Sequence, residues 1–237
     1  MPPDEALPEG AEKVRAVRTM FDTIAPRYDL VNRVMTFGLD RVWRSQTVTA
    51  LDLGPGSVVV DLACGTGDLC RQLERAGYRA IGVDLSLGML VHAHTASPLV
   101  EGDAARLPFP ASSVDGVVSG FALRNFADLD VVFGELARIV RPGGRIALLD
   151  VAVPCHPLLR AGHAVYFGHV APLIGGLLSD PDAYRYLPRS VAYLPPLDEL
   201  LTRITRAGFG DVDRQLLSGG ITQLLTATRQ PPARFPR

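Results

Sequence analysis

The stretch that decides the fold is VVVDLACGTGDLC, from Val58 to Cys70. Its β-branched and apolar beginning predicts a buried strand, and the glycines at 65 and 67 predict a sharp turn into a helix. Turns of this kind usually approach a nucleotide at the N-terminus of the helix. Asp68 follows the turn, so a pyrophosphate bound there would meet a fixed negative charge. The stretch therefore indicates a nucleotide-like ligand that carries no phosphate.

Strands and helices alternate after this turn. Predicted strands cover residues 57–63, 79–86, 98–104, 113–123 and 145–153. Predicted helices cover residues 69–76, 87–94, 130–140 and 196–209, and RPGG at 141–144 predicts a turn. Strands separated by helices favour an α/β fold with a mainly parallel sheet that is covered on both faces. Residues 211–229 read as a final hairpin around two glycines, which would make the last strand antiparallel.

Two helical segments frame this alternation. Apolar residues recur at three- and four-residue steps over residues 11–51, which predicts an N-terminal helical cap with a break at Pro26. Residues 154–194 form an insertion after the fifth strand. Its apolar part, 158–178, is long enough to cross a bilayer, but Arg160 and Pro172 interrupt it, so we expect amphipathic helices. We expect residues 11–230 to form one domain.

Composition excludes several classes of protein. The chain has 237 residues, a formal net charge of −1 and an ordinary globular share of apolar residues, so no nucleic-acid partner is expected. Its three cysteines lack C-x-x-C spacing, and its histidines lack metal-site spacing, so neither a disulfide framework nor a metal site is indicated. The acidic, proline-rich start does not resemble a secretory signal, which makes a cytoplasmic location the expectation.

Three kinds of ligand compete for the glycine turn. A phosphate-binding P-loop needs a lysine and a hydroxyl after Gly67, and neither is present. A dinucleotide fingerprint that begins at Gly65 would need glycine where Cys70 stands. S-adenosylmethionine has no phosphate and carries a positive sulfonium and a positive amino group. Asp61 and Asp68 would attract it.

Two further carboxylates follow later strands. Asp84 ends the second strand, where it could hold ribose hydroxyls, and Asp103 ends the third, where it could accept from an adenine amino group. Each acid has a simpler interpretation: Asp68 as a helix cap, Asp84 as a turn residue and Asp103 as a surface acid. The glycine turn and two strand-end acids, in this order, favour the cofactor.

The chain resembles class I S-adenosylmethionine-dependent methyltransferases, and more narrowly the ubiquinone/menaquinone biosynthesis C-methyltransferase family. The resemblance extends over residues 17–226. Its general motifs are DLACGTGDL, DLSLGML, GDAARLPFP and RIVRPGGRIALLD. Its more specific motifs are MFDTIAPRYDLVNRVMTFGLDRVWR, GFALRNFADL and SDPDAYRYLPRSV. The resemblance implies a Rossmann-like sheet with the N-terminal cap and the insertion placed over an acceptor site.

The resemblance also implies cofactor contacts at Thr66, Asp84, Asp103 and Ala104. The expected cofactor-binding residues are Asp61, Gly65, Thr66, Gly67, Asp84, Leu85, Asp103, Ala104 and Gly120. The chain departs from the family pattern at five positions. Gly120 stands where serine is common, and Val31, Thr36, Asp40 and Asp150 stand where Met, Ser, His and Glu are usual. These changes bear on the acceptor more than on the cofactor.

Methylation of a quinol ring carbon, which the resemblance implies, sets the chemistry. Loss of a ring hydroxyl proton directs electron density to the neighbouring carbon, and the methylated ring must then lose a proton. Arg124 and Asn125 follow the fourth strand, and Arg124 could stabilise the phenolate or orient a water that takes the proton. Tyr28 of the cap could contact ring oxygens, and Asp150 could be the base. Alternatively, Arg124 pairs with an acid such as Asp128, Tyr28 is packing, and Asp150 is a buried acid.

The expected activity is methylation of a prenylated quinol, with demethylmenaquinol as the first candidate. A class I methyltransferase acting on another lipophilic small molecule is the alternative, and a protein that binds the cofactor without turnover is a third. A prenylated acceptor would bring the enzyme to the inner face of the cell membrane as a peripheral protein. The sequence also admits a homodimer.

Overall fold

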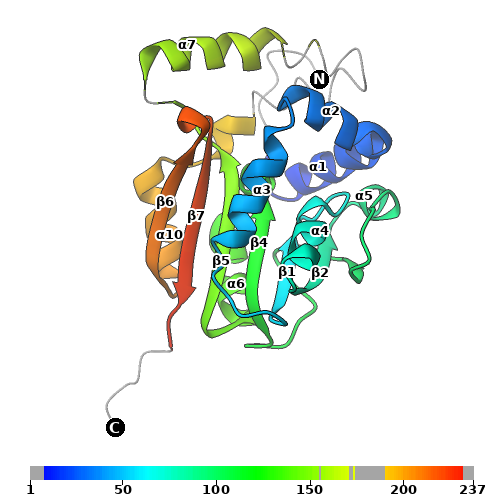
Figure 1. Cartoon of the computed structure of the whole chain (residues 1–237), viewed down its shortest axis with the longest axis vertical. Coiled ribbons are helices and arrows are strands. Elements are labelled where there is room, and N and C mark those ends of the chain that lie inside the picture. Colours follow the sequence, from blue (N-terminus) through cyan, green and yellow to red (C-terminus); the bar gives the residue numbers. More distant parts are fainter. Residues whose placement is uncertain (1–7, 155, 171–172, 174–189, 232–237) are drawn as a thin grey trace.

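A seven-stranded sheet forms the centre of the structure, a computed structural model that describes residues 8–154, 156–170, 173 and 190–231 (Figure 1). The strands are β1 (Val58–Leu62), β2 (Arg79–Asp84), β3 (Leu99–Glu101), β4 (Val114–Gly120), β5 (Val140–Val151), β6 (Phe209–Leu217) and β7 (Thr222–Arg229). Their order is β3-β2-β1-β4-β5-β7-β6. The first five pair in parallel, and β7 is antiparallel to both β5 and β6. The predicted α/β sheet with one antiparallel strand is confirmed.

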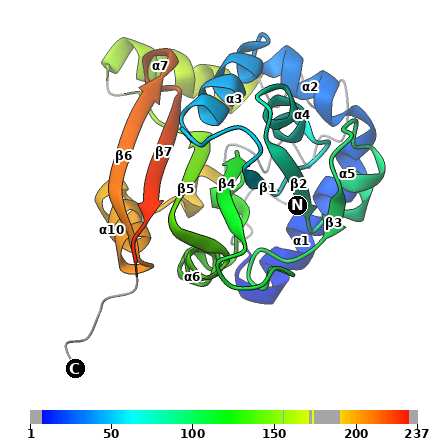
Figure 2. The same cartoon turned by 60° about the horizontal axis from the view of Figure 1, so that its bottom comes forward.

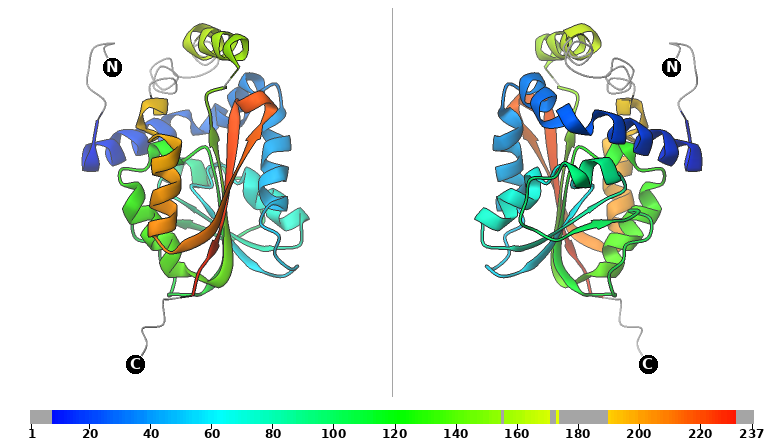
Figure 3. Two further views of the ribbon diagram at one scale, coloured as in Figure 1. Left: turned by 90° about the vertical axis from the view of Figure 1, so that its left-hand side faces the viewer. Right: turned by 90° about the vertical axis from the view of Figure 1, so that its right-hand side faces the viewer.

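Helices cover both faces of this sheet (Figures 2 and 3). The helices that follow strands are α4 (Asp68–Arg75), α5 (Leu87–Val91), α6 (Leu129–Ile139) and α10 (Leu197–Arg206). The cap consists of α1 (Gly10–Ile24), α2 (Tyr28–Met35) and α3 (Leu39–Thr49). A short 3₁₀ turn, Ala25–Arg27, separates α1 from α2 at the predicted break. A second break follows Met35, where Gly38 has a φ of 75°.

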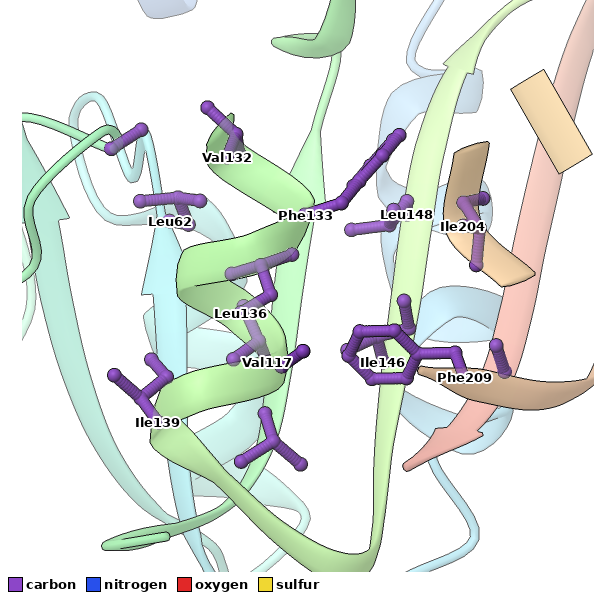
Figure 4. Packing of buried hydrophobic residues seen from close by; sticks show 14 of the residues in the cluster. Leu62, Val117, Val132, Phe133, Leu136, Ile139, Ile146, Leu148, Ile204 and Phe209 are labelled. Atoms are coloured by element: carbon purple, nitrogen blue, oxygen red, sulfur yellow. The ribbon is translucent and has the colours of Figure 1, made fainter. Parts of the chain in front are cut away.

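The strands are apolar at successive positions because each face of the sheet has its own core. Val60 of β1 and Leu148 of β5 belong to the core under α6 and α10, where Phe133 and Phe209 are fully buried (Figure 4). Val59, one position away in β1, belongs to the core under α3 and α4. Side chains alternate between faces along a strand, so a run such as Val58–Leu62 indicates burial on both sides.

The predicted turn at RPGG is wrong. Residues 141–144 lie within β5 as a bulge, because β5 pairs with β4 on both sides of it: Val140 opposite Val114, and Arg145 opposite Gly116. Gly143 has a φ of 80°, which favours glycine. A Cβ on Gly144 would lie 2.5 Å from the Asp115 carbonyl oxygen. The glycines thus allow the bulge within a continuous strand.

Part of the insertion after β5 is described. It begins with α7 (Pro157–Val165) and a π-helical turn, Tyr166–Val170, which lie above the carboxyl ends of the strands (Figure 1). Much of the predicted insertion, including the AYRYL motif, falls outside the described residues. Within the described part of the chain, no helix has the length and apolar character needed to cross a bilayer.

Candidate active site

The glycine turn after β1 is held by the acid at the end of β2. The Asp84 carboxylate accepts from the Gly65 N–H at 2.7 Å and from the Ser86 N–H at 2.8 Å, one on each oxygen. Burial raises the pKa of Asp84, and these N–H groups oppose that rise. A carboxylate oxygen can accept more than one hydrogen bond, so Asp84 can also take hydroxyl donors of a ligand.

A pocket of about 200 Å³, the strand-end pocket, opens beside this turn. Six predicted cofactor-binding residues line it: Gly65, Asp84, Leu85, Asp103, Ala104 and Gly120. The α1 residues Val17 and Phe21 form its other wall. Arg18 also lines it, but its guanidinium pairs with Glu101 at 2.5 Å. The carboxylates of this pocket therefore favour a cationic ligand.

Three other predicted cofactor-binding residues, Asp61, Thr66 and Gly67, support the turn instead of lining the pocket. Asp61 Oδ2 accepts from the Cys70 N–H at 3.0 Å, whereas its buried Oδ1 has no hydrogen-bond partner among the described residues. Burial raises the pKa of Asp61 to about 7. The Thr66 hydroxyl donates to Asp29, and Gly67, with a φ of 83°, is the N-cap residue that precedes α4.

Asp68 does not supply the free negative charge that the sequence suggested. Its carboxylate pairs with Arg71, one turn along α4, and lies 3.6 Å from Arg44 of α3. Two guanidinium groups therefore neutralise it. The partner on α4 follows from the i, i+3 spacing, but the partner on α3 depends on how the cap packs.

A second pocket, of about 370 Å³, lies under the cap and is called the cap pocket here. Its lining comes from α1, α2, α3, α7, the loop after β4 and the start of β7, and it is mostly apolar. Of the predicted catalytic residues, Tyr28, Arg124 and Asn125 line it, whereas Asp150 does not. The two pockets share four lining residues: Phe21, Tyr28, Phe121 and Asn125.

Arg124 and Asp150 form a buried ion pair. Arg124 Nη1 donates to Asp150 Oδ1, and its Nε donates to Ser190 Oγ at 3.1 Å. Asp150 is fully buried behind Arg124, so it cannot reach a molecule in the cap pocket as a base. Asp128 caps α6 instead of pairing with Arg124. The alternative interpretation, that Arg124 pairs with an acid, is therefore correct, but the acid is Asp150 and not Asp128.

Tyr28 stands where the two pockets meet. Burial raises the pKa of its hydroxyl, and the charge of Arg44 opposes that rise. The phenol is therefore protonated near neutral pH and can donate a hydrogen bond.

Several further polar residues line the cap pocket but were not predicted as site residues; of those described next, only Thr36 and Asp40 had been noted, as departures from the family pattern. Asp40 accepts from Arg44 at 2.8 Å and from the Thr36 hydroxyl at 2.9 Å, and all three line the pocket. The i, i+4 spacing of Asp40 and Arg44 on one helix was the available signal. Thr222 of β7 lies opposite Val151, and its buried hydroxyl has no partner among the described residues. Nothing in the local sequence indicates Thr222, because the order of the strands places it there.

Comparison with protein families gives one description for nearly the whole chain. The model of the ubiE/COQ5 methyltransferase family matches residues 9–229. The ubiquinone/menaquinone biosynthesis C-methyltransferase UbiE of Syntrophotalea carbinolica is 40% identical over 224 residues, which are 91% of this chain and 94% of the relative. A demethylmenaquinone methyltransferase of Roseiflexus castenholzii is 40% identical over 232 residues, 94% and 98% of the two chains.

Solved structures confirm the fold at low sequence identity. A Thermotoga maritima S-adenosylmethionine-dependent methyltransferase, described as a possible histamine N-methyltransferase, superposes with a TM-score of 0.63 at 19% identity, over 90% of this chain and 100% of that one. A [4+2]-cyclase superposes with a TM-score of 0.67 at 15% identity, over 95% and 99%. Since these structures differ in described activity, the fold alone does not decide the reaction.

Proposed function

This chain belongs to the ubiE/COQ5 methyltransferase family, and we propose that it methylates a ring carbon of demethylmenaquinol to give menaquinol. The methyl donor is S-adenosylmethionine. Support for the acceptor comes from relatives about 40% identical over nearly the full length of both chains, which are named for demethylmenaquinone or for menaquinone biosynthesis.

The strand-end pocket fits the cofactor. We assign the ribose hydroxyls to Asp84, and the adenine amino group to Asp103 with Ala104 beside it. Asp61, buried behind the turn, does not line this pocket and holds the start of α4 through the Cys70 N–H. When bound, S-adenosylmethionine supplies a methyl group on a positively charged sulfur.

The main support for the proposal is that the two pockets adjoin and share lining residues. A methyl group can pass directly from one bound molecule to another only where both sites open on the same point. Tyr28, Phe121 and Asn125 line both pockets and mark that point. The apolar lining of the cap pocket suits an aromatic ring with a hydrocarbon chain.

The cap pocket offers hydrogen-bond donors for the oxygens of the ring. Tyr28 and Arg124 can stabilise the phenolate, and Asp150 positions Arg124 from behind through the buried ion pair. The unpartnered Thr222 hydroxyl can contact a second ring oxygen. Because Asp150 does not reach the pocket, we assign the final proton to a water that Arg124 orients.

One observation favours a second acceptor, a different lipophilic small molecule. Thr36 and Asp40 stand where the family commonly has serine and histidine, and here they form one hydrogen-bonded unit with Arg44 in the pocket wall. Because Thr36 and Arg44 both hydrogen-bond to Asp40, the two substitutions together can alter the shape and charge of the pocket wall that faces the ring.

Labelled methyl transfer tests the proposal. The enzyme is given ¹³C-methyl S-adenosylmethionine with a short-chain demethylmenaquinol, and with a related quinol and a phenol as competing acceptors. We expect the label on the ring carbon of demethylmenaquinol, as identified by NMR. Transfer only to another acceptor would support the second candidate, and binding without transfer to any acceptor would contradict both.

A prenylated acceptor is dissolved in the bilayer, so we also propose that the enzyme works as a peripheral protein at the membrane surface. The hydrocarbon chain then stays in the bilayer while the ring enters the cap pocket.

A further inference from the structure

Exposed apolar side chains gather around the cap pocket. In the described part of the chain, fifteen large apolar side chains are exposed, of which five lie in residues 30–42 and six in residues 153–173. Phe37 and Leu158 are each 78% exposed. Soluble surfaces normally carry such residues singly, so their concentration in two segments indicates a contact surface.

These two segments form the two sides of one opening. The Tyr166 hydroxyl, after α7, donates to the Met35 carbonyl oxygen at 2.6 Å, and the rings of Tyr166 and Phe37 lie 5.9 Å apart. Leu39 and Leu158 both line the cap pocket. Figures 1 and 3 show α2 and α7 at the same end of the molecule, beyond the carboxyl ends of the parallel strands. We call residues 30–42 and 157–165 together the pocket-mouth surface.

Helix α7 is unusual because none of its residues is buried. Leu158 and Val165 lie at its two ends, and the second is 59% exposed. An apolar helix face normally packs on a core, whereas among the described residues α7 borders only the cap pocket and, through Leu159, the turn between β6 and β7.

Phe37 gives a second, independent indication. It has a φ of 52°, a left-handed conformation that is rare for an aromatic residue, and it lies in the tight turn between α2 and α3. The turn is closed by the Gly38 N–H, which donates to the Arg33 carbonyl oxygen at 3.0 Å. A strained backbone that presents an apolar ring to solvent is typical of a functional contact.

The charges beside this surface are positive. Arg27, Arg33 and Arg41 are exposed, and Arg160 is exposed on α7. The carboxylates nearby are occupied: Asp29 accepts from Thr66, and Asp40 is buried beside Arg44. Among the described residues of both segments, the exposed charges are therefore arginines alone.

We propose that the pocket-mouth surface docks onto an anionic lipid bilayer. Phe37 and Leu158 enter the interfacial region, and the arginines meet the lipid headgroups. Docking in this orientation turns the opening of the cap pocket toward the bilayer, in which a prenylated acceptor is dissolved. The role of docking in catalysis therefore rests on the proposed function. The evidence for docking, the apolar surface and its charge, is independent of the acceptor.

Vesicle co-sedimentation of the full chain, without any acceptor, tests the inference. We expect binding to vesicles of phosphatidylcholine with phosphatidylglycerol, and much weaker binding to phosphatidylcholine alone. Phe37→Asp should weaken binding about tenfold or more, because an apolar ring can no longer be buried. Arg33→Gln with Arg41→Gln should weaken it about 25-fold on anionic vesicles, about fivefold for each charge.

Val91→Asp is the matched control, because Val91 is 72% exposed but lies on α5, away from the opening, so its binding should equal that of the wild type. The arginine variant should methylate a short-chain acceptor in solution normally, which separates docking from the reaction. Equal vesicle binding by all variants, no binding by the wild type, or self-association through this surface in place of binding would overturn the inference. If the wild type does not methylate the short-chain acceptor in solution, that result would contradict the proposed function and not the docking inference.

Discussion

The strand-end pocket and the cap pocket are built in different ways. The first is formed largely by the ends of neighbouring parallel strands and the turns that follow them, so its acids lie at fixed places in short motifs. The second is assembled from α2, α3, α7 and β7, which are far apart in the sequence. The first pocket presents carboxylates, whereas the second holds its charges in buried pairs, Arg124 with Asp150 and Arg44 with Asp40.

This difference suggests a division of tasks. A cofactor that many enzymes share can be bound by a local strand-turn arrangement, while the acceptor is selected by segments that only the complete fold brings together. If the division holds, substitutions in one pocket should leave ligand affinity in the other nearly unchanged. Substitutions of Asp84, Arg124 and Thr222 test that separation, and Asp61 tests the support behind the glycine turn.

Asp84→Ala should have the largest effect. It removes the carboxylate that we assign to the ribose and that also holds the Gly65 N–H, so the dissociation constant for S-adenosylmethionine should rise roughly 1,000-fold. Calorimetry measures this directly. Asp103→Asn, at an exposed position, is the milder control, and it should raise the dissociation constant for S-adenosylmethionine about tenfold or less. Unchanged affinity in Asp84→Ala would remove the basis for the cofactor assignment.

Arg124→Gln should lower kcat roughly 100- to 1,000-fold and leave the dissociation constant of the cofactor within about threefold. It also leaves Asp150 buried without its partner, which should reduce the free energy of unfolding by about 3–5 kcal/mol. The double variant Arg124→Gln with Asp150→Asn should recover stability but not activity. Recovery of both would show that the pair is only structural.

Asp61 gives a pH-dependent test of the support behind the glycine turn. Its pKa is about 7 in the folded chain and lower when unfolded, so the folded state holds the extra proton between roughly pH 4 and 7. Stability therefore falls as pH rises; this group contributes a slope of about 1.4 kcal/mol per pH unit near pH 5, which drops to about half of that at pH 7. Denaturant unfolding of the wild type against Asp61→Asn isolates that slope. Identical slopes in the two proteins would contradict the raised pKa.

Thr222→Val should have the smallest effect and the most selective one. The acceptor KM should rise about fivefold because one hydrogen bond is lost, while cofactor affinity stays the same. The free energy of unfolding should increase by about 1 kcal/mol, because a buried hydroxyl without a partner is removed. A weaker cofactor affinity with an unchanged acceptor KM would reverse the roles of the two pockets.

The sequence predicted the strand-end pocket better than the cap pocket. Gly65, Asp84 and Asp103 could be placed because each lies directly at or after a strand, and parallel strands end at one edge. Asp61 and Thr66 belong to the same motif but face inward, which depends on side-chain direction within the turn. The neutralisation of Asp68 by Arg44 required the packing of α3, which no local pattern contains.

The cap pocket shows why the remainder could not be predicted. Tyr28 was singled out only through the family resemblance, whereas Arg124 was also indicated by its place after the fourth strand. Asp150 lies at the end of the fifth strand as expected, yet burial and pairing with Arg124 keep it out of the cap pocket. Thr222 faces the pocket because β7 lies next to β5 in the sheet, and strand order is a property of the whole fold.

A crystal structure with S-adenosylhomocysteine and a short-chain demethylmenaquinol is the most direct test of the central claim. We expect the nucleoside in the strand-end pocket beside Asp84, the ring in the cap pocket, and the sulfur facing the ring between Tyr28, Phe121 and Asn125. Both molecules in one pocket, or a sulfur that faces away from this junction, would contradict the account.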